Sequence, residues 1–397
     1  MTPLRLTSFT ATSAVGRGLG ETLDALVAQR SGLAPCAFET VEIETHVGEV
    51  RGVDATALPE DLRSFNCRNN RLAQLALLQD GFIDAVAASA ERWGPKRIGV
   101  FLGTSTSGIL ETELAYRARD PASGALPREF NYAATHNSFS VADFILSALH
   151  LEGPGAVMCT ACSSSAKVFA SAQRMISAGM IDAAVVGGVD SLCLTTLYGF
   201  HSLQLTSRVP CRPFDVARDG ISIGEAAAFV LLERPPAQVD GDAIMLLGTG
   251  ESSDAYHMSS PHPEGRGARA SIQQALLAAE LVPGDIDYIN LHGTATVSND
   301  SAEDLAVTSV FGTRTACSST KGATGHALGA AGALEAVICA LAIQKGLMPG
   351  GLRTTDVDPK LKLHYLRENE RTDVRRVLSN SFGFGGANCS LIFGRAG

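Results

Sequence analysis

Cys162 is placed where a thiol could act as a nucleophile, at the junction of a strand and a helix. Residues 155–159 can form a strand, and a helical pattern runs from about residue 163 to 178, before the stop signal Gly179. Backbone N–H groups and the helix dipole favour an anion at such a helix start. We therefore predict that this thiol ionises more readily than a free cysteine and attacks an acyl group. The alternative is a buried structural cysteine in an alanine-rich helix.

Two histidines and a lysine lie in loops that follow predicted strands. His292 comes after the strand-like residues 287–291, and Lys321 shares another such loop with His326. A lone histidine is more often structural, but two histidines in glycine- and threonine-rich turns fit catalytic loops better. Neutral imidazoles can donate hydrogen bonds to a developing oxyanion. One cysteine with two histidines therefore suits carbon–carbon bond formation at a thioester. The cysteine would hold an acyl group, and the histidines would stabilise the enolate left when a malonyl unit loses CO2.

The composition limits which cellular compartment and which partners are plausible. The chain has 397 residues, 45% of them hydrophobic, which is ample for a large core. Its formal net charge of −9 argues against nucleic acid as a partner. Nine scattered cysteines indicate free thiols, so we expect a cytoplasmic protein. Cys159 and Cys162 have the spacing of a redox or metal pair, but no second pair or nearby histidine completes it. We therefore expect neither a metal nor a cofactor.

The most apolar long run covers residues 327–343 and has Glu335 at its centre. A buried helix fits this run better than a membrane span, because it is short and carries a charge. The first residues also lack the charged and apolar regions of a signal peptide. We therefore expect no membrane span.

Strand-like and helix-like segments alternate along the chain, which predicts an α/β protein. The clearest break is Pro235-Pro236 followed by residues 240–242, and it suggests an N-terminal half of residues 1–240 and a C-terminal half of residues 241–397. Cys162 and His326 each precede an alanine-rich helix, which is a weak sign of two duplicated halves.

Five motifs spread over essentially the whole chain resemble those of the β-ketoacyl-acyl carrier protein synthases, the elongating condensing enzymes of the thiolase superfamily. They are residues 160–165 (TACSSS), 212–220 (RPFDVARDG), 292–296 (HGTAT), 321–326 (KGATGH) and 380–388 (NSFGFGGAN). The resemblance implies a thiolase fold, in which two similar halves form five layers, αβαβα, and the protein is a dimer. It also implies decarboxylative condensation of an acyl thioester with malonyl-acyl carrier protein.

The same resemblance implies roles for individual residues. Cys162 would be the acylated nucleophile, and His292 and His326 would act in malonyl decarboxylation and condensation. The backbone N–H groups of Cys162 and Phe384 would form the oxyanion hole for the thioester. Phe382 and Phe384 would lie on a gating loop between the acyl and malonyl sites.

Three charged residues would support that site. The resemblance implies that Lys321 orders the histidine pair. Asp300 and Glu303 match an acidic pair downstream of the first histidine, and they would hold Lys321 and the loop.

The motifs also depart from the family pattern. The TACSSS motif resembles polyketide-type ketosynthases more than housekeeping ones, and residues 294–300 lack the usual glycine and proline. A specialised synthase for a polyene or polyketide-like chain is therefore as well supported as one for ordinary fatty acids. A degradative thiolase would have a second catalytic cysteine where Phe384 stands, and an initiating synthase would have asparagine at His326. A non-catalytic subunit that only sets chain length is the alternative from another class, but such subunits typically lack the cysteine retained as Cys162.

The expected partner is an acyl carrier protein, loaded with an acyl or malonyl group. Carrier proteins are acidic, so an acidic enzyme needs a local basic patch to dock them. We predict that Arg63, Arg68 and Arg71 form this patch, with Arg208 as a weaker candidate, although arginines near a helix start are usually a solvated face. We expect a homodimer, with a heterodimer of related subunits as the alternative.

Overall fold

The computed structural model describes all 397 residues. Each half contributes five main strands to a mixed sheet. The strands of the first half are β1 (Leu4–Ser13), β5 (Ile98–Gly103), β6 (Gly155–Met158), β7 (Ala183–Asp190) and β9 (Ala226–Glu233). Those of the second half are β10 (Ile244–Ser253), β11 (Tyr288–Asn290), β12 (Ala316–Ser318), β16 (Arg376–Phe382) and β17 (Ala387–Arg395).

The two halves repeat one topology. The first half has the strand order β1-β9-β7-β5-β6, and the second has the order β10-β17-β16-β11-β12. Numbered within each half, both orders are first, fifth, fourth, second, third. The directions also agree, because the first two pairings are antiparallel and the last two are parallel in each half. An antiparallel contact between β1 and β10 joins the halves. The structure thus has the two similar halves of the expected fold.

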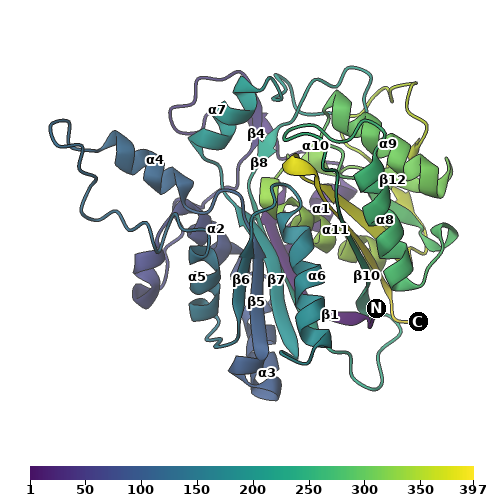
Figure 1. The fold of residues 1–397 in the computed structure, drawn as a ribbon, viewed down its shortest axis with the longest axis horizontal. Coiled ribbons are helices and arrows are strands. Elements are labelled where there is room, and N and C mark those ends of the chain that lie inside the picture. The colour runs from purple at the N-terminus through teal and green to yellow at the C-terminus, as the bar shows by residue number, and fades with distance from the viewer.

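Two helices fill the space between the half-sheets. They are α6 (Ser164–Ser177) and α11 (Ala331–Lys345), and both contact strands of both halves as well as each other (Figure 1). Every residue from 331 to 343 in α11 is buried. One apolar segment, residues 328–345, has the length and hydropathy of a membrane span, but 89% of it is buried inside the fold. The run 327–343 is therefore a core helix, as predicted, and its burial on all sides explains its low charge.

Helices on the two outer faces complete five layers. The first half is covered by α2 (Arg68–Leu77), α3 (Phe82–Trp93) and α5 (Ser140–Ala148), and the second by α8 (Arg266–Ala279) and α9 (Val297–Phe311). The other helices are α1 (Gly18–Val27), α4 (Ile109–Arg117), α7 (Leu194–Ser202) and α10 (Lys321–Thr324). The short strands are β2 (Gly16–Arg17), β3 (Ala34–Pro35), β4 (His46–Gly48), β8 (Ile223–Gly224), β13 (Leu347–Met348), β14 (His364–Tyr365) and β15 (Glu370–Arg371).

The carboxyl ends of the parallel strands bring the chemical groups together. Cys162 follows β6, His292 follows β11, and the loop with Lys321 and His326 follows β12. Phe384 follows β16. Loops at the carboxyl ends of parallel strands meet at one edge of a sheet, which is where α/β proteins place their ligand sites. The repeated topology therefore positions residues from both halves around one centre.

One edge of the sheet is open. Strand β6 pairs only with β5, and all four of its residues are partly exposed. Helix α4 and the loop after it project away from the rest of the molecule (Figure 1). An unpaired edge strand beside a projecting arm is a surface on which another chain can add.

Candidate active site

Cys162 lies in a tight turn between β6 and α6. Ala161, just before it, has a left-handed backbone with φ +53°, which is uncommon for a residue with a side chain. The Ser164 hydroxyl accepts a hydrogen bond from the Thr160 N–H (2.8 Å), and the Ser163 hydroxyl donates one to the Thr160 carbonyl (2.9 Å). These serines hold the turn, so they are structural parts of the motif rather than only small neighbours of the thiol.

The segment around Phe384 packs directly on this turn. A Cβ atom at Gly383 would lie 2.6 Å from the Thr160 carbonyl oxygen, so only glycine allows this approach. The N–H groups of Phe384 and of Cys162 both favour the thiolate form of Cys162, as does the charge of Lys321. Two N–H groups at one sulfur form the arrangement that a thioester oxyanion requires.

The prediction of an easily ionised thiol is wrong for the resting protein. Burial raises the pKa of Cys162 to about 11, and the N–H groups and Lys321 only partly oppose that rise. Desolvation outweighs the effect of the helix start because Cys162 is buried, with an exposed fraction of 5% for the residue. At neutral pH the group is therefore a thiol, and it must lose its proton as it attacks.

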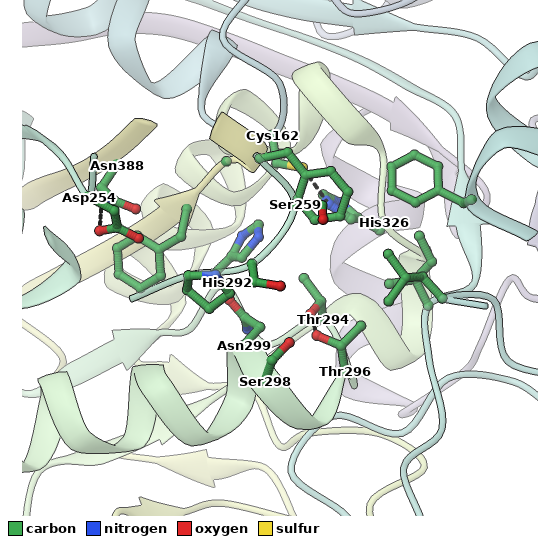
Figure 2. A pocket seen from close by; sticks show the side chains of 18 residues that line it. Cys162, Asp254, Ser259, His292, Thr294, Thr296, Ser298, Asn299, His326 and Asn388 are labelled. Atoms are coloured by element: carbon green, nitrogen blue, oxygen red, sulfur yellow. Dashed lines mark hydrogen bonds between the residues drawn. The ribbon is translucent and has the colours of Figure 1, made fainter. Parts of the chain in front are cut away.

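Both histidines meet the thiol. His326 Nε2 lies 3.0 Å from Cys162 Sγ, and the His292 and His326 rings meet edge to face with centroids 5.3 Å apart (Figure 2). The ligand atoms of all three side chains lie within 4.8 Å of one another. Burial, together with the nearby Lys321 charge, lowers the pKa of His292 and of His326 well below the usual range. Both rings are therefore neutral, as hydrogen-bond donors to an enolate should be.

Lys321 connects the two histidine loops. Its ammonium donates to the His292 carbonyl oxygen (2.5 Å) and forms an ion pair with Glu335 of α11. The expectation that Asp300 and Glu303 hold Lys321 is therefore wrong. Sequence reasoning missed Glu335 as the partner, although a lone charge in the middle of a buried apolar helix is a signal that it needs an opposite charge.

The acidic pair holds the His292 loop instead. Glu303 accepts hydrogen bonds from the N–H groups of His292 (2.8 Å) and Gly293 (2.8 Å). Asp300 accepts them from the N–H groups of Phe214 (2.8 Å) and Ala295 (3.2 Å). The loop part of the expectation therefore agrees with the geometry, and both carboxylates act through the backbone.

A first cavity of about 50 Å³ opens in front of Cys162, His292 and His326. Hydroxyl and amide groups line the side near His292, and the threonine hydroxyls at 294 and 296 hydrogen-bond each other (2.9 Å; Figure 2). Phe382 packs on the His292 ring at a centroid distance of 5.9 Å. Hydrogen-bonding groups therefore lie beside the two imidazoles in a cavity whose lining surface is otherwise mostly apolar.

A second cavity lies on the other side of the thiol. Its volume is about 260 Å³, and the first cavity shares three of its lining residues: Cys162, Phe384 and Phe200. The Phe384 ring packs against the Phe200 ring of α7 at a centroid distance of 5.5 Å. The two rings stand between the cavities, so Phe384 is placed as a gating residue would be. Phe200 was missed, because a single phenylalanine in a helix carries no sequence signal of its position.

The predicted docking patch is only partly exposed. Arg68 is buried, with a side-chain exposure of 3%, and it forms ion pairs with Glu225 (2.7 Å), Asp54 (2.7 Å) and Glu49 (3.1 Å). Arg68 therefore cannot dock a carrier, and that prediction is wrong. Arg68 is the first residue of α2, a helix with several polar residues on its buried side. Its position beside other arginines therefore wrongly suggested that it is exposed. Arg63, with a side-chain exposure of 71%, remains accessible.

Replacing Arg68 with alanine is expected to destabilise the fold. Glu225 is fully buried and also accepts hydrogen bonds from the backbone, so the change leaves a buried carboxylate without its cation. Such losses cost about 3–5 kcal/mol. The free energy of unfolding from urea titration measures this, with Arg63→Ala as the control, because its exposed pair with Glu60 contributes about 0–1 kcal/mol. Equal stability of the two variants would contradict the structural role of Arg68.

Comparison with known proteins agrees with this geometry. The model of the β-ketoacyl synthase N-terminal domain matches residues 6–237, and the model of the β-ketoacyl synthase C-terminal domain matches residues 244–355. The chain is 32% identical over 410 aligned positions to 3-oxoacyl-(acyl-carrier-protein) synthase 2 of Coxiella burnetii, covering 98% of each chain.

Two solved structures are similar over the whole chain. The first is the ketosynthase ApeO in complex with its chain length factor ApeC from Xenorhabdus doucetiae. That match has 38% identity and a TM-score of 0.90, and it covers 100% of this chain and 98% of the other. The second is the ishigamide ketosynthase/chain length factor, with 27% identity, a TM-score of 0.89 and full coverage of both chains. With its cysteine and both histidines in place at the junction of two thiolase-like halves, the chain belongs to the β-ketoacyl synthase family, and it is a condensing acyltransferase.

Proposed function

We propose that Cys162 carries the growing acyl chain and that His292 and His326 generate and hold the attacking enolate. The observation that carries this proposal is the meeting of a buried thiol with two neutral imidazoles, at 3.0 Å for the nearer one, between two cavities. A nucleophile between two cavities can hold one substrate on one side while it receives the other from the opposite side.

The first half-reaction transfers the acyl group to the protein. Cys162 Sγ attacks the carbonyl carbon of an acyl-carrier thioester, and the oxyanion points to the N–H groups of Cys162 and Phe384. The thiol proton passes by way of His326 Nε2, 3.0 Å away, to the departing carrier sulfur. The products are an acyl-cysteine and a free carrier thiol. The acyl chain then occupies the second cavity, which frees the first for malonyl-carrier.

The second half-reaction forms the carbon–carbon bond. The malonyl thioester carbonyl accepts hydrogen bonds from His292 Nε2–H and from His326 in the tautomer that carries its proton on Nε2, which forms after acyl transfer, so loss of CO2 leaves a stabilised enolate. The enolate carbon attacks the acyl-cysteine carbonyl, the Cys162 thiolate leaves and takes up one proton from solvent to restore the thiol, and β-ketoacyl-carrier is released. Lys321 fixes the spacing of the two histidines through the His292 carbonyl and Glu335, and its charge disfavours protonation of the rings.

We further propose that the chain serves a polyene- or polyketide-type pathway as the catalytic member of a heterodimer. The TACSSS motif and the altered 294–300 loop support this, as does 38% identity over the full chain to a chain of a solved complex of a ketosynthase with its chain length factor. The open edge of β6 and the arm around α4 offer the surface for such a partner. Because Cys162, His292 and His326 are all present and lie together, the alternative that this chain is a non-catalytic subunit is disfavoured.

Carrier docking remains part of the proposal in a reduced form. Arg63 and Arg208 are exposed and can attract an acidic carrier, whereas Arg71 is mostly covered and pairs with Asp54 (3.3 Å). We place the protein in the cytoplasm, which its nine free cysteines support. The division into residues 1–240 and 241–397 also stays a prediction, with the linker between β9 and β10 as its basis.

A comparison of acyl substrates tests the pathway. The purified chain, with malonyl-carrier in excess, is given saturated, conjugated and β-keto acyl-carriers of equal length in separate single turnovers. We expect conjugated or β-keto chains to be elongated at least as fast as the saturated chain. A saturated chain elongated about tenfold faster than both would show that the enzyme serves ordinary fatty acids. A homodimer that elongates conjugated chains fully by itself would remove the need for a chain length factor.

A further inference from the structure

Asp190 is a buried carboxylate at the end of β7 that the mechanism above does not use. One oxygen, Oδ1, accepts four hydrogen bonds, from the N–H groups of Ser105 (2.7 Å) and Thr106 (2.8 Å) and from the hydroxyls of Thr104 (2.8 Å) and Thr106 (2.7 Å). The other, Oδ2, accepts a hydrogen bond from the N–H of Gly329. Burying a carboxylate costs free energy unless hydrogen-bond donors surround it. The five donors around fully buried Asp190 therefore indicate a specific structural role.

The donors come from two segments that line the second cavity. Ser105 lines that cavity from the first half, and Leu328 lines it from the second half, next to Gly329. Leu328 has a left-handed backbone with φ +49°, which is strained for a leucine and needs support from its neighbours. Gly329 lies three residues after His326. The two oxygens of Asp190 therefore hold both walls of the acyl cavity, the Ser105 segment and the Leu328 segment, at one point.

The tie is tight. A Cβ atom at Gly329 would lie 2.7 Å from the Ser105 hydroxyl oxygen and 2.8 Å from Asp190 Oδ2. No atom fits between the three residues, so a shift of Asp190 must shift both walls. Packed contacts of this kind transmit small displacements.

The duplicated topology supports a positioning role for Asp190. The loop with Ser105 follows β5, which is the second strand of its half, and the loop with His292 follows β11, the second strand of the other half. In each case a buried carboxylate accepts hydrogen bonds from two successive backbone N–H groups of the loop. Glu303 does so for the malonyl-side loop, and Asp190 does so for the acyl-side loop.

We propose that Asp190 is a positioning residue that fixes Ser105 and Leu328 as the walls of the acyl cavity and thereby sets which acyl chains Cys162 accepts. This rests on the proposed role of Cys162 as the acyl carrier. An acetyl group needs little more than the sulfur and the oxyanion hole. A longer chain must pass between the walls, so its transfer depends on their spacing.

The variant Asp190→Asn is expected to lose the hydrogen bond from the Gly329 N–H and to keep those from residues 104–106. Four donors surround the Oδ1 position, so the amide oxygen stays there, and the new NH2 group faces the Gly329 N–H. Two donors that face each other repel, so the segment with Leu328 and Gly329 should move. The Ser105 loop should keep its position, because its hydrogen bonds to residue 190 remain. Acylation of Cys162 is followed by intact mass with acetyl-carrier and with dodecanoyl-carrier. We expect the ratio of their rates to change by about tenfold or more, with the dodecanoyl rate falling and the acetyl rate nearly unchanged.

Asp182→Asn is the matched control. Asp182 directly precedes the same strand and pairs with Arg97 (2.7 Å) and Arg234 (3.2 Å), so it tests loss of a carboxylate at the other end of β7. It should leave the ratio unchanged. Equal losses for both acyl groups in Asp190→Asn, or no change, would overturn the proposal. If that variant does not fold, Thr106→Val, which removes one donor to Asp190, is judged by the same ratio. Failure of the wild-type protein to acylate Cys162 with either carrier would instead count against the proposed function.

Discussion

Cys162→Gln is expected to lose all condensation and yet to decarboxylate malonyl-carrier faster than Cys162→Ala does. Neither variant has a sulfur that can hold an acyl group. The glutamine side chain, however, carries a planar amide whose carbonyl resembles that of an acyl-cysteine. This carbonyl can accept hydrogen bonds from the N–H groups at position 162 and at Phe384, both of which approach the sulfur in the wild-type protein.

The position of Phe384 explains the difference between the two variants. Its ring packs on Phe200 between the cavities, and a filled oxyanion hole holds its backbone as in the acylated enzyme. His292 and His326 are untouched, so malonyl-carrier still binds and its enolate takes a proton in place of an acyl group. Removing one oxyanion-type interaction typically costs about 10²–10³-fold, so we expect CO2 release from the glutamine variant to exceed that from the alanine variant by about tenfold or more.

Release of CO2 and of acetyl-carrier from both variants measures this effect. The control is the double variant Cys162→Gln with His292→Ala, which should be slow because one enolate donor is gone. If Cys162→Gln is as inert as that double variant, then glutamine does not mimic the acyl-cysteine. The separation of the cysteine from the histidine pair would then be wrong as well.

Loss of either histidine is expected to reduce condensation by about a hundredfold or more, because each supplies one donor to the enolate. The two variants should differ at the earlier step. His326 Nε2 lies 3.0 Å from Cys162 Sγ, and the thiol is protonated at neutral pH, so His326→Ala should also slow acylation. His292 has no such contact with the sulfur, so His292→Ala should be acylated nearly as fast as the wild-type protein.

Intact mass after brief incubation with acyl-carrier separates the two steps, and CO2 release reports the second. Lys321 and Glu335 remain paired in both variants, so the loops should stay in place. Equal acylation rates in His292→Ala and His326→Ala would remove His326 from the proton path. Full condensation in either variant would remove that histidine from the mechanism.

Motif positions could be predicted from the sequence, because each catalytic residue lies in a turn or loop after a predicted strand. Cys162 was placed at a strand-to-helix turn and His292 and His326 in glycine- and threonine-rich loops, and all three meet in the structure. The buried helix over residues 327–343 was also predictable, since a long apolar run with a single charge fits a helix in the core. The family resemblance then supplied the two-half fold, which local patterns only hinted at.

Properties set by burial could not be predicted in this way. The helix start suggested an acidic thiol, but the sulfur is enclosed by both halves, and desolvation raises its pKa to about 11. Arg68 looked like part of a surface patch, but the fold brings Glu225, 157 residues away, directly against it. Phe200 is likewise far in sequence from its partner Phe384, whereas Glu335 is only 14 residues from Lys321 but lies in a separate helix. Each of these depends on which residues the fold brings together, and a single sequence does not give that information.

The measurement that most directly tests the central claim follows one acyl group through Cys162. The protein is incubated with acyl-carrier, the mass increase is mapped to a peptide, and malonyl-carrier is then added. We predict that the acyl group is found on Cys162 alone among the nine cysteines, and that it leaves as β-ketoacyl-carrier with one CO2 released for each group transferred. An acyl group on another residue, or β-ketoacyl-carrier formed while the adduct on Cys162 stays in place, would contradict the account.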